Sequence, residues 1–482
     1  MASCNAATLS PYIPSAGDPW NEVKIRHFYN AIGFGANKTQ IDLALQAQPG
    51  QMISDWLDNS YSKPLMDKPY WADWILPEFD QEDPYGQSYE FSYAFVGDWI
   101  NSMLDDPLRE KMVLFWSNHF VAKFESYGIC TWLYDYQRIL QKHALGNFKE
   151  FTREVGLCNA MLVFLNGVEN TKFEPNENYA RELMELFTMG LDNGYTETDI
   201  REIARAFTGY NKYIFQWEKI EYFPQFHDSD PKTIFGETGN YDYDGVIDLL
   251  FDKRGDQIAH FICKQLYKFL VSYDVNEDIV NEMAQTFQNS NFELLPVLKQ
   301  LLCSEHFFNE KALNNKIKSP FEYFGTFFNL FNARLDNEEI RNGFVWYCSS
   351  LGQTLFDPVD VSGWPGDKAW IDSGSLLVRW LYSGWLFGYL CDKKAFAVIS
   401  FMKDVTGNSN DVEFVTKTLV DYFLVEGLYT QSDYDKMLIK FKGDIPENYF
   451  EQGLWNLDWD NVQWQFYLMM EEFKMSPDIN LA

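Results

Sequence analysis

Apolar side chains recur every three to four residues through most of the chain, whereas runs that alternate apolar and polar residues are few. A repeat near 3.6 residues is typical of helices that bury one face. The pattern therefore predicts an all-α, mainly helical protein with a small β-hairpin or ribbon as decoration. The helices that we expect span residues 19–34, 39–58, 108–123, 130–165, 176–189, 197–208, 244–272, 276–289, 292–302 and 319–334, and helices resume after residue 370.

Three segments depart from the helical pattern. Aromatic and polar residues alternate from Tyr210 to Phe223, which favours a short hairpin or ribbon. The segments Pro77–Tyr89 and Pro224–Asp244 read as long loops, and long loops in compact proteins are often functional. We therefore expect a small sheet and two long loops beside the helices.

The domain organisation follows from one linker. Polar residues and a glycine interrupt the helical pattern at Val405–Asp411. We expect a main helical body over residues 1–400 and a helical C-terminal portion over residues 411–482.

The charge of the chain limits its partners. The formal net charge is −31, from 70 acidic and 39 basic residues, and no basic run offsets it. Such a surface repels a phosphate backbone, so we expect no nucleic-acid partner. Aromatic residues make up 18% of the chain, which is high, so these rings must pack in a core or bind a ligand.

From the chain as given we expect neither an export signal nor a membrane span. The N-terminal segment lacks a basic and an apolar stretch, and the apolar segment Leu376–Leu390 is short and contains Arg379. The seven cysteines are scattered without a close pair, which is typical of reduced thiols. From the chain as given we expect a cytoplasmic protein.

The segment 176–189 carries the first candidate chemistry. As a helix, it places Arg181, Glu182 and Glu185 on one side and apolar residues on the other. These charges can be a solvated face with an ordinary Arg181–Glu185 pair. Alternatively, Glu182 and Glu185 are partly buried and act as an acid–base pair or as metal ligands.

Two histidines are further candidates. His119 falls on the apolar stripe of its helix, where a histidine is either a hydrogen-bonded core residue or a ligand. His227 and Asp228 lie in the second long loop, followed by Lys232, so they either form a turn or point into a cleft.

Metal binding would unite these candidates. His119, Glu182, Glu185 and His227 supply two nitrogen and two carboxylate ligands, a set suited to zinc, iron or manganese if they meet in space. Calcium is the weaker expectation. Residues 240–248 match the start of a calcium-binding EF-hand loop, but Phe251 occupies the position of the final acidic ligand.

Glycine and proline flank Trp364 in the sequence Gly363-Trp364-Pro365-Gly366. Such a tryptophan can form a stacking platform for a sugar, or it can plug the loop onto the helices. No serine-hydrolase elbow, zinc-protease helix, phosphate-binding loop or dinucleotide fingerprint occurs, so these classes have no support.

Six ordered motifs resemble a bacterial family known as domain of unknown function 1800, over about residues 15–385. The motifs are Trp116-Ser117-Asn118-His119-Phe120, Asn176-Glu177-Asn178-Tyr179-Ala180-Arg181-Glu182-Leu183-Met184-Glu185-Leu186-Phe187-Thr188-Met189-Gly190, Ala204-Arg205-Ala206-Phe207-Thr208-Gly209, His227-Asp228, Lys318-Ser319-Pro320 and Gly363-Trp364-Pro365-Gly366. The resemblance supplies no reaction. It implies that export is possible, that a sulfatase-like protein is a possible partner, and that the substrate belongs to polysaccharide or other cell-surface material.

Two functions remain open. The first is an enzyme, a metal-dependent hydrolase or oxidoreductase. Its expected catalytic residues are Glu182, Glu185, His119, Arg181, His227 and Asp228, and its expected substrate contacts are Trp364, Trp116, Asn178 and Lys232. The second is a non-catalytic protein that binds glycan or another protein through its aromatic residues. A buried carboxylate pair beside His119 would favour the enzyme, because buried acids are costly unless they are paired.

Overall fold

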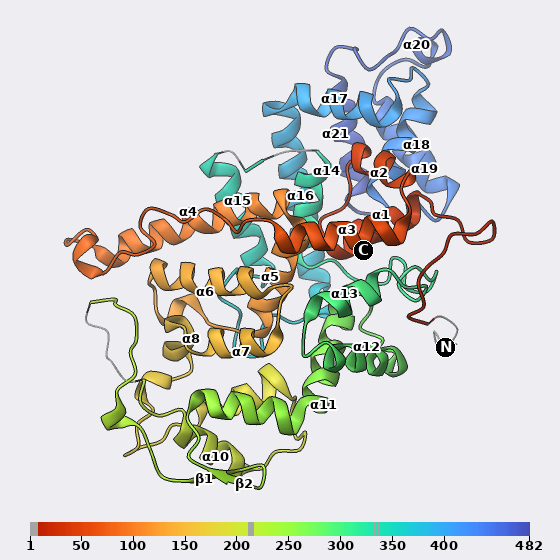
Figure 1. Cartoon of the computed structure of the whole chain (residues 1–482). Coiled ribbons are helices and arrows are strands. Elements are labelled where there is room, and N and C mark those ends of the chain that lie inside the picture. Colours follow the sequence, from red (N-terminus) through yellow and green to blue (C-terminus); the bar gives the residue numbers. More distant parts are fainter. Residues whose placement is uncertain (1–7, 211–215, 332–333, 336) are drawn as a thin grey trace.

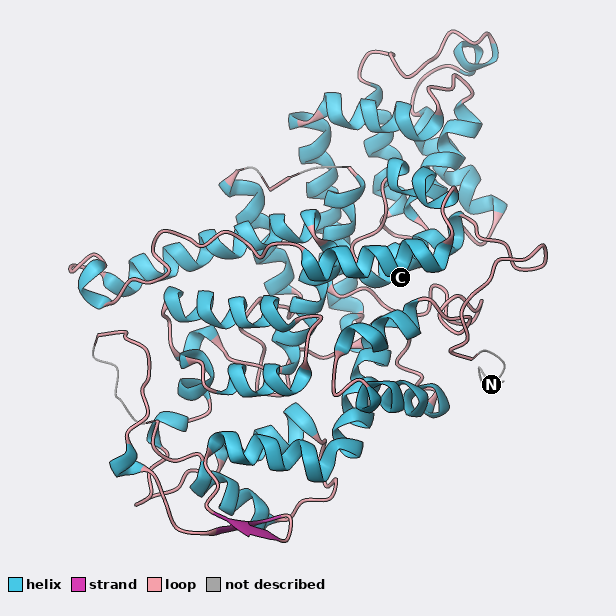
Figure 2. Cartoon of the chain, in the orientation of Figure 1, coloured by secondary structure: helices cyan, strands magenta, loops and turns pink. Residues whose placement is uncertain are grey.

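The computed structural model describes residues 8–210, 216–331, 334–335 and 337–482. Helices dominate these residues, and the two strands pair as one antiparallel hairpin, so the predicted all-α class with a small hairpin is confirmed (Figures 1 and 2). No helix in the described part of the chain is both long and apolar enough to cross a membrane.

The first third of the chain supplies the helices that surround the candidate site. They are α1 (Glu22–Ile32), α2 (Lys38–Leu45), α3 (Pro49–Ser62), α4 (Pro84–Asp105), α5 (Pro107–His119), α6 (Cys130–His143), α7 (Phe148–Gly156) and α8 (Asn159–Phe164). The helix predicted over residues 39–58 is two helices, because Pro49 begins a new one.

The middle third holds α9 (Asn178–Glu182), a π-helical turn η4 (Leu183–Thr188), α10 (Glu197–Ala206), β1 (Lys232–Ile234), β2 (Glu237–Gly239), α11 (Tyr243–Leu270), α12 (Glu277–Asn289) and α13 (Leu294–Leu302). The last third holds α14 (Pro320–Leu330), α15 (Glu338–Ser350), α16 (Ser373–Lys393), α17 (Ala395–Thr406), α18 (Val412–Phe423), α19 (Gln431–Lys442), α20 (Glu447–Glu451) and α21 (Val462–Phe473). Figure 1 shows α17–α21 at one end of the molecule and the hairpin at the other.

The hairpin lies elsewhere than predicted. Residues 216–223 form no strand, residues 211–215 lie outside the described residues, and the two strands fall in the segment predicted as a long loop. The turn residues Phe235 and Gly236 both have positive φ, 51° and 83°, which is the geometry of a tight hairpin turn. The carboxylate of Asp199 on α10 accepts the Phe235 N–H at 2.7 Å and holds the turn in place.

The other predicted loop, Pro77–Tyr89, is correct only in its first part. Asp83 accepts a hydrogen bond from the Gly86 N–H, and Pro84 opens the 22-residue helix α4. An aspartate before a proline is a helix start signal, and here it outweighs the acidic, proline-bearing composition of the segment.

Candidate functional site

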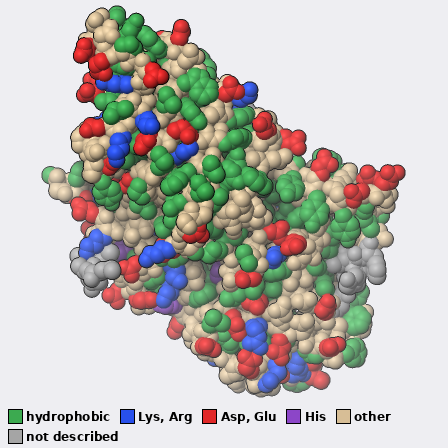
Figure 3. Space-filling view, turned by 180° about the vertical axis from the view of Figure 1, so that it is seen from behind, with side chains coloured by type: hydrophobic (Ala, Val, Ile, Leu, Met, Phe, Trp, Pro, Cys, Tyr) green, Lys and Arg blue, Asp and Glu red, His purple; other side chains and the backbone are tan. Residues whose placement is uncertain are grey.

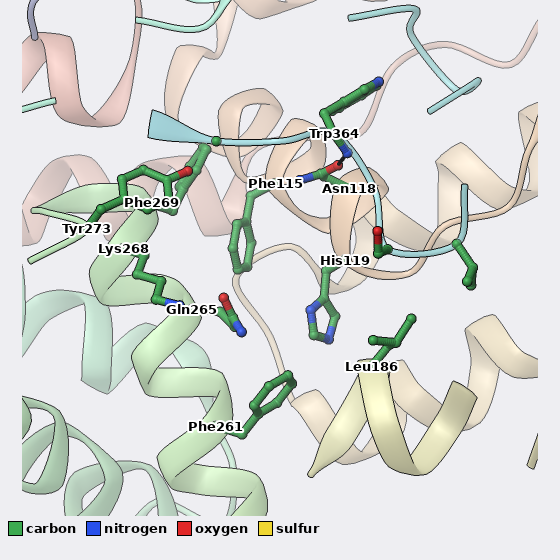
Figure 4. Close-up of a pocket in the computed structure, with 13 residues that line it drawn as sticks. Phe115, Asn118, His119, Leu186, Phe261, Gln265, Lys268, Phe269, Tyr273 and Trp364 are labelled. Carbon is green, nitrogen blue, oxygen red and sulfur yellow. Dashed lines mark hydrogen bonds between the residues drawn. The ribbon is translucent and has the colours of Figure 1, made fainter. Parts of the chain in front are cut away.

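The candidate site is a cavity of about 250 Å³ between α5, η4, α11 and the loop of residues 361–366. The residues that line it are Phe115, Asn118, His119, Leu186, Phe261, Gln265, Lys268, Phe269, Tyr273, Val361, Ser362, Trp364 and Gly366. Figure 4 shows His119 on one side of this space and Gln265 and Lys268, both from α11, on the other. Three of the motifs that resemble the family, those with His119, Leu186 and Trp364, therefore meet here although they are far apart in the sequence.

His119 ends α5 and points into the cavity (Figure 4). Its Nε2 lies 2.8 Å from the carbonyl oxygen of Phe187. A carbonyl only accepts, so Nε2 carries the hydrogen and Nδ1 carries the lone pair. Among the residues that the structure describes, no side chain or backbone group forms a hydrogen bond with Nδ1.

The surroundings of His119 keep it neutral. The Phe115 ring stacks on the imidazole with ring centroids 6.2 Å apart, and Phe120 meets it edge-on at 4.8 Å. Burial among these rings lowers the pKa of His119 to about 4, although the hydrogen bond to Phe187 acts to raise it. At neutral pH the side chain is therefore a hydrogen-bond acceptor at Nδ1 and a donor at Nε2.

The partner of His119 depends on the unusual end of the motif helix. Met189 donates its N–H to the Met184 carbonyl at 3.1 Å, a bond across five residues, and the Thr188 hydroxyl donates to Leu183 at 2.5 Å. Gly190 then takes φ 87° and ends the helix. The carbonyl of Phe187 is one of the last carbonyls of this helix, which lack a helical partner, and it is free to accept from His119.

The loop with Trp364 closes the cavity through Asn118. The Asn118 side-chain oxygen accepts a hydrogen bond from the Trp364 backbone N–H. The Trp364 indole is only 6% exposed and points away from the other labelled residues in Figure 4. This arrangement fits the loop plug that the sequence also allowed, rather than a stacking platform.

The predicted carboxylate pair lies outside the cavity lining. Arg181 binds Glu185 at 3.1 Å and Glu197 at 2.7 Å, as in the ordinary charged face that was the simpler expectation. Partial burial and the nearby Glu185 raise the pKa of Glu182. Of this helix, the residue that lines the cavity is Leu186.

The His227 loop forms a separate polar cluster. His227 Nδ1 lies 2.9 Å from the Thr208 carbonyl oxygen, and Asp228 binds Arg205 through two contacts of 2.8 and 3.2 Å. Lys232 is buried and donates to the carbonyls of Asp228 and Asp230. These contacts fit a structural turn, and none of these side chains lines the cavity.

The structure does not assemble the expected metal ligands. Among the described residues, no group of three or more His, Cys, Asp or Glu side chains could hold a metal ion. His119, Glu182, Glu185 and His227 thus do not form the predicted zinc, iron or manganese site. In the loop that resembles a calcium site, Asp244 and Asp248 instead bind Arg153 at 2.7 and 2.9 Å.

Two other expected substrate contacts, Trp116 and Asn178, form hydrogen bonds away from the cavity. Trp116 is fully buried and donates its Nε1 hydrogen to the Ala144 carbonyl at 3.0 Å. Asn178 donates through its side chain to Asn166 at 3.2 Å and starts the motif helix. Neither lines the cavity.

The sequence reasoning missed Asn118, Gln265, Lys268 and Tyr273. One signal was present: Gln265 interrupts the apolar row Phe261–Phe269 on α11, at one-turn spacing. A polar residue in a row of aromatic residues, all facing one way, marks a polar spot on a packed face.

Comparison with known proteins bears on the family and on nothing finer. No curated protein and no solved structure matches this chain. A family model with the description "Protein of unknown function (DUF1800)" matches residues 27–470. The match extends past residue 385, where the predicted resemblance ended, into the C-terminal helices. The chain belongs to this family.

Proposed function

We propose that this protein is an enzyme that hydrolyses a small substrate in the cavity, with His119 as the general base. The observation that carries the proposal is the hydrogen bond from Nε2 to the Phe187 carbonyl, 2.8 Å long. It fixes the ring so that the lone pair of Nδ1 is free on the cavity side. A base held in one tautomer by a second group is an arrangement that favours general-base catalysis.

In this reaction Nδ1 accepts a proton from water while the water oxygen bonds to the electrophilic carbon or phosphorus of the substrate. The proton then passes from the imidazolium to the leaving group, and the bond to that group breaks. The Phe187 carbonyl stabilises the imidazolium, because it accepts the Nε2 hydrogen in both protonation states. With a pKa of about 4, His119 keeps its lone pair free at neutral pH.

The local backbone supports a functional site. Single π-helical turns are rare in proteins and occur often at functional sites. The turn η4 presents both the carbonyl that orients His119 and the Leu186 side chain that lines the cavity. On the strength of the family resemblance, we propose that this small substrate is a fragment of polysaccharide or of other cell-surface material.

A second candidate function is glycan binding without catalysis. Tyr85, Tyr89 and Tyr93 follow one another at one-turn spacing on α4 and are 54%, 40% and 59% exposed. A row of exposed tyrosines offers ring faces on which sugars stack. Figure 3 shows hydrophobic side chains gathered across the back face of the molecule.

The experiment that tests the first candidate compares wild type with His119→Gln on panels of p-nitrophenyl esters, phosphate esters and glycosides. Glutamine places its amide nitrogen near the position of Nε2, so it can still donate to Phe187, but it has no acceptor at the position of Nδ1. We expect the rate of hydrolysis to be about 100-fold or more lower in the variant than in wild type. The free energy of unfolding should agree between the two proteins within about 1 kcal/mol.

The pH profile adds a second readout. The kcat/KM of wild type should be level above about pH 5 and fall as His119 is protonated near pH 4. Equal hydrolysis by wild type and His119→Gln would refute the general base. Glycan binding that is lost in a Tyr89→Ala, Tyr93→Ala variant, with no hydrolysis by wild type, would favour the second candidate.

A further inference from the structure

Lys268 faces the cavity opposite His119, and no carboxylate lies within ion-pair distance of it in the part of the chain that the structure describes (Figure 4). It belongs to a row of basic residues on α11, with Lys264 one turn earlier and His260 two turns earlier. The Glu277 carboxylate contacts the other two members of the row, at 3.1 Å from His260 and 2.5 Å from Lys264. The third member of the row is thus left to the cavity.

An unpaired lysine is unexpected in a chain with 70 acidic and 39 basic residues. Partial burial lowers the pKa of Lys268 and the neighbouring Lys264 lowers it further, although the more distant Glu277 acts to raise it. Removing an ammonium group from water is costly unless an anion replaces the lost solvation. A ligand with a negative charge would supply it.

The rest of the lining suits an anion as well. No acidic residue occurs among the described residues that line the cavity. Gln265 and Tyr273 can donate hydrogen bonds. Burial, together with Glu322 and Asp367, raises the pKa of Tyr273 to about 12, so its hydroxyl keeps its proton at neutral pH.

The wall behind Phe269 carries further positive charge. Lys316 donates to the Phe269 carbonyl, and its Nζ lies 5.0 Å from the centre of the Phe269 ring. Lys111 lies 5.8 Å from the same ring. The single carboxylate between them, Glu322, is 2.9 Å from Lys111 and 4.0 Å from Lys316, so it balances only one of the two charges.

We infer that the cavity binds its ligand through an oxyanion, a carboxylate or a phosphate, held by Lys268 and the donors beside it. The inference rests on the proposed function only in using the same cavity. His119 Nδ1 then faces a part of the ligand that donates a hydrogen bond, or the attacking water. At about 250 Å³ the space is near the lower limit for ligand sites, which indicates a small organic acid or phosphate ester.

The test is a titration of the full chain with inorganic phosphate, followed by calorimetry or by the shift in unfolding temperature, with chloride at equal ionic strength as reference. Succinate, in a second titration, distinguishes a preference for carboxylate from one for phosphate. We expect saturable binding of at least one of the two. Lys268→Met should weaken it about tenfold or more, the loss of one charge-assisted hydrogen bond.

Two variants control for folding and for general charge. Lys264→Met removes the same charge one turn away, where Glu277 already binds it, and should leave the affinity within about threefold of wild type. Lys268→Arg keeps a cation at the site and should retain most of the binding. Binding that is absent in wild type, or equal in Lys268→Met and wild type, would overturn the inference.

The two proposals fail separately. His119→Gln keeps Lys268 and the donors beside it, so it should retain saturable binding of phosphate or succinate even though hydrolysis is lost. Hydrolysis that depends on His119 without anion binding would overturn only the oxyanion inference. Anion binding that depends on Lys268 without hydrolysis would overturn only the proposed reaction.

Discussion

The side-chain oxygen of Asn118 accepts the backbone N–H of Trp364 and so joins the end of α5 to the loop that closes the cavity. This contact requires that the loop backbone come very close to α5. Gly363 makes the approach possible: a Cβ atom there would overlap the Asn118 side chain and lie 2.6 Å from its carbonyl oxygen. The position also has φ 87°, which glycine adopts without strain.

Gly363→Ala should therefore destabilise the protein and open the cavity. We expect about 1–2 kcal/mol from the left-handed backbone, and about 1–3 kcal/mol more from the overlap with Asn118. Gly352→Ala is the matched control, because Gly352 has φ 85° but open space where a Cβ would lie. Urea unfolding of both variants measures the difference; equal losses would show that the close approach contributes nothing.

The assigned tautomer of His119 makes a second prediction. In protein labelled with ¹⁵N-histidine, the resonances of His119 are those that disappear in His119→Gln. They should show a hydrogen on Nε2 and none on Nδ1 at pH 7, since the Phe187 carbonyl can only accept a hydrogen bond. The same resonances should titrate near pH 4. A hydrogen on Nδ1, or titration near the ordinary histidine pKa, would contradict the site geometry.

The sequence predicts an element well where neighbouring residues determine it, and poorly where residues distant in the chain hold it. Local signals located α10 well: the helix predicted over residues 197–208 spans Glu197–Ala206, and a capping box of Thr196 and Asp199 begins it. By contrast, the hairpin turn at Phe235-Gly236 lacks the asparagine or aspartate that usually marks such a turn, and Asp199 from a distant helix holds it. That contact is invisible to a pattern read along the chain.

The candidate site shows the same limit. Periodicity placed His119 on the buried face of its helix, which the structure bears out, because aromatic rings surround it. Its partner Phe187 and the opposing Lys268 lie 68 and 149 positions away along the chain, and only the packing of α5, η4 and α11 brings them together. The predicted ligands were chosen for their chemistry, and packing left Glu182 and His227 elsewhere.

The buried charges behind the cavity make a third prediction. Glu322 is 7% exposed and sits between Lys111 and Lys316. Glu322→Gln leaves both cations without a counter-charge, and breaking a buried pair in this way costs roughly 3–5 kcal/mol. The control is Asp58→Asn, which breaks the exposed pair with Lys299 and should cost ~1 kcal/mol or less.

The same pair of variants tests a pH dependence. Burial acts to raise the pKa of Glu322, but Lys111 and Lys316 outweigh it and hold the pKa at about 2, below the ordinary 4.5. Glu322 therefore holds its proton more weakly in the folded state than in the unfolded state. Its contribution to the free energy of unfolding is complete above pH 4.5 and is lost as the pH falls toward 2. The stability gap between wild type and Glu322→Gln should narrow below pH 4.5; a constant gap would contradict the ion pair.

Glu110 makes a fourth prediction with the opposite sign. It is 2% exposed, and its two oxygens accept from Trp99 and from Gln141, each at 2.6 Å. Burial raises its pKa to about 7, against 4.5 in the ordinary state, although both hydrogen bonds act to lower it. Between pH 4.5 and 7 the folded state thus binds more protons, and stability falls as pH rises through this range.

Glu110→Gln should remove this dependence without loss of packing. The oxygen of the new amide can still accept a hydrogen bond from Trp99. Its nitrogen can donate to the Gln141 oxygen, which has no partner in wild type, once the Gln141 amide rotates by half a turn. We expect the variant to be as stable as wild type near pH 5 and more stable by a few kcal/mol at pH 8, since it no longer buries a charge. Urea unfolding midpoints of both proteins from pH 5 to 8 measure this, and parallel curves would mean that Glu110 does not titrate in that range.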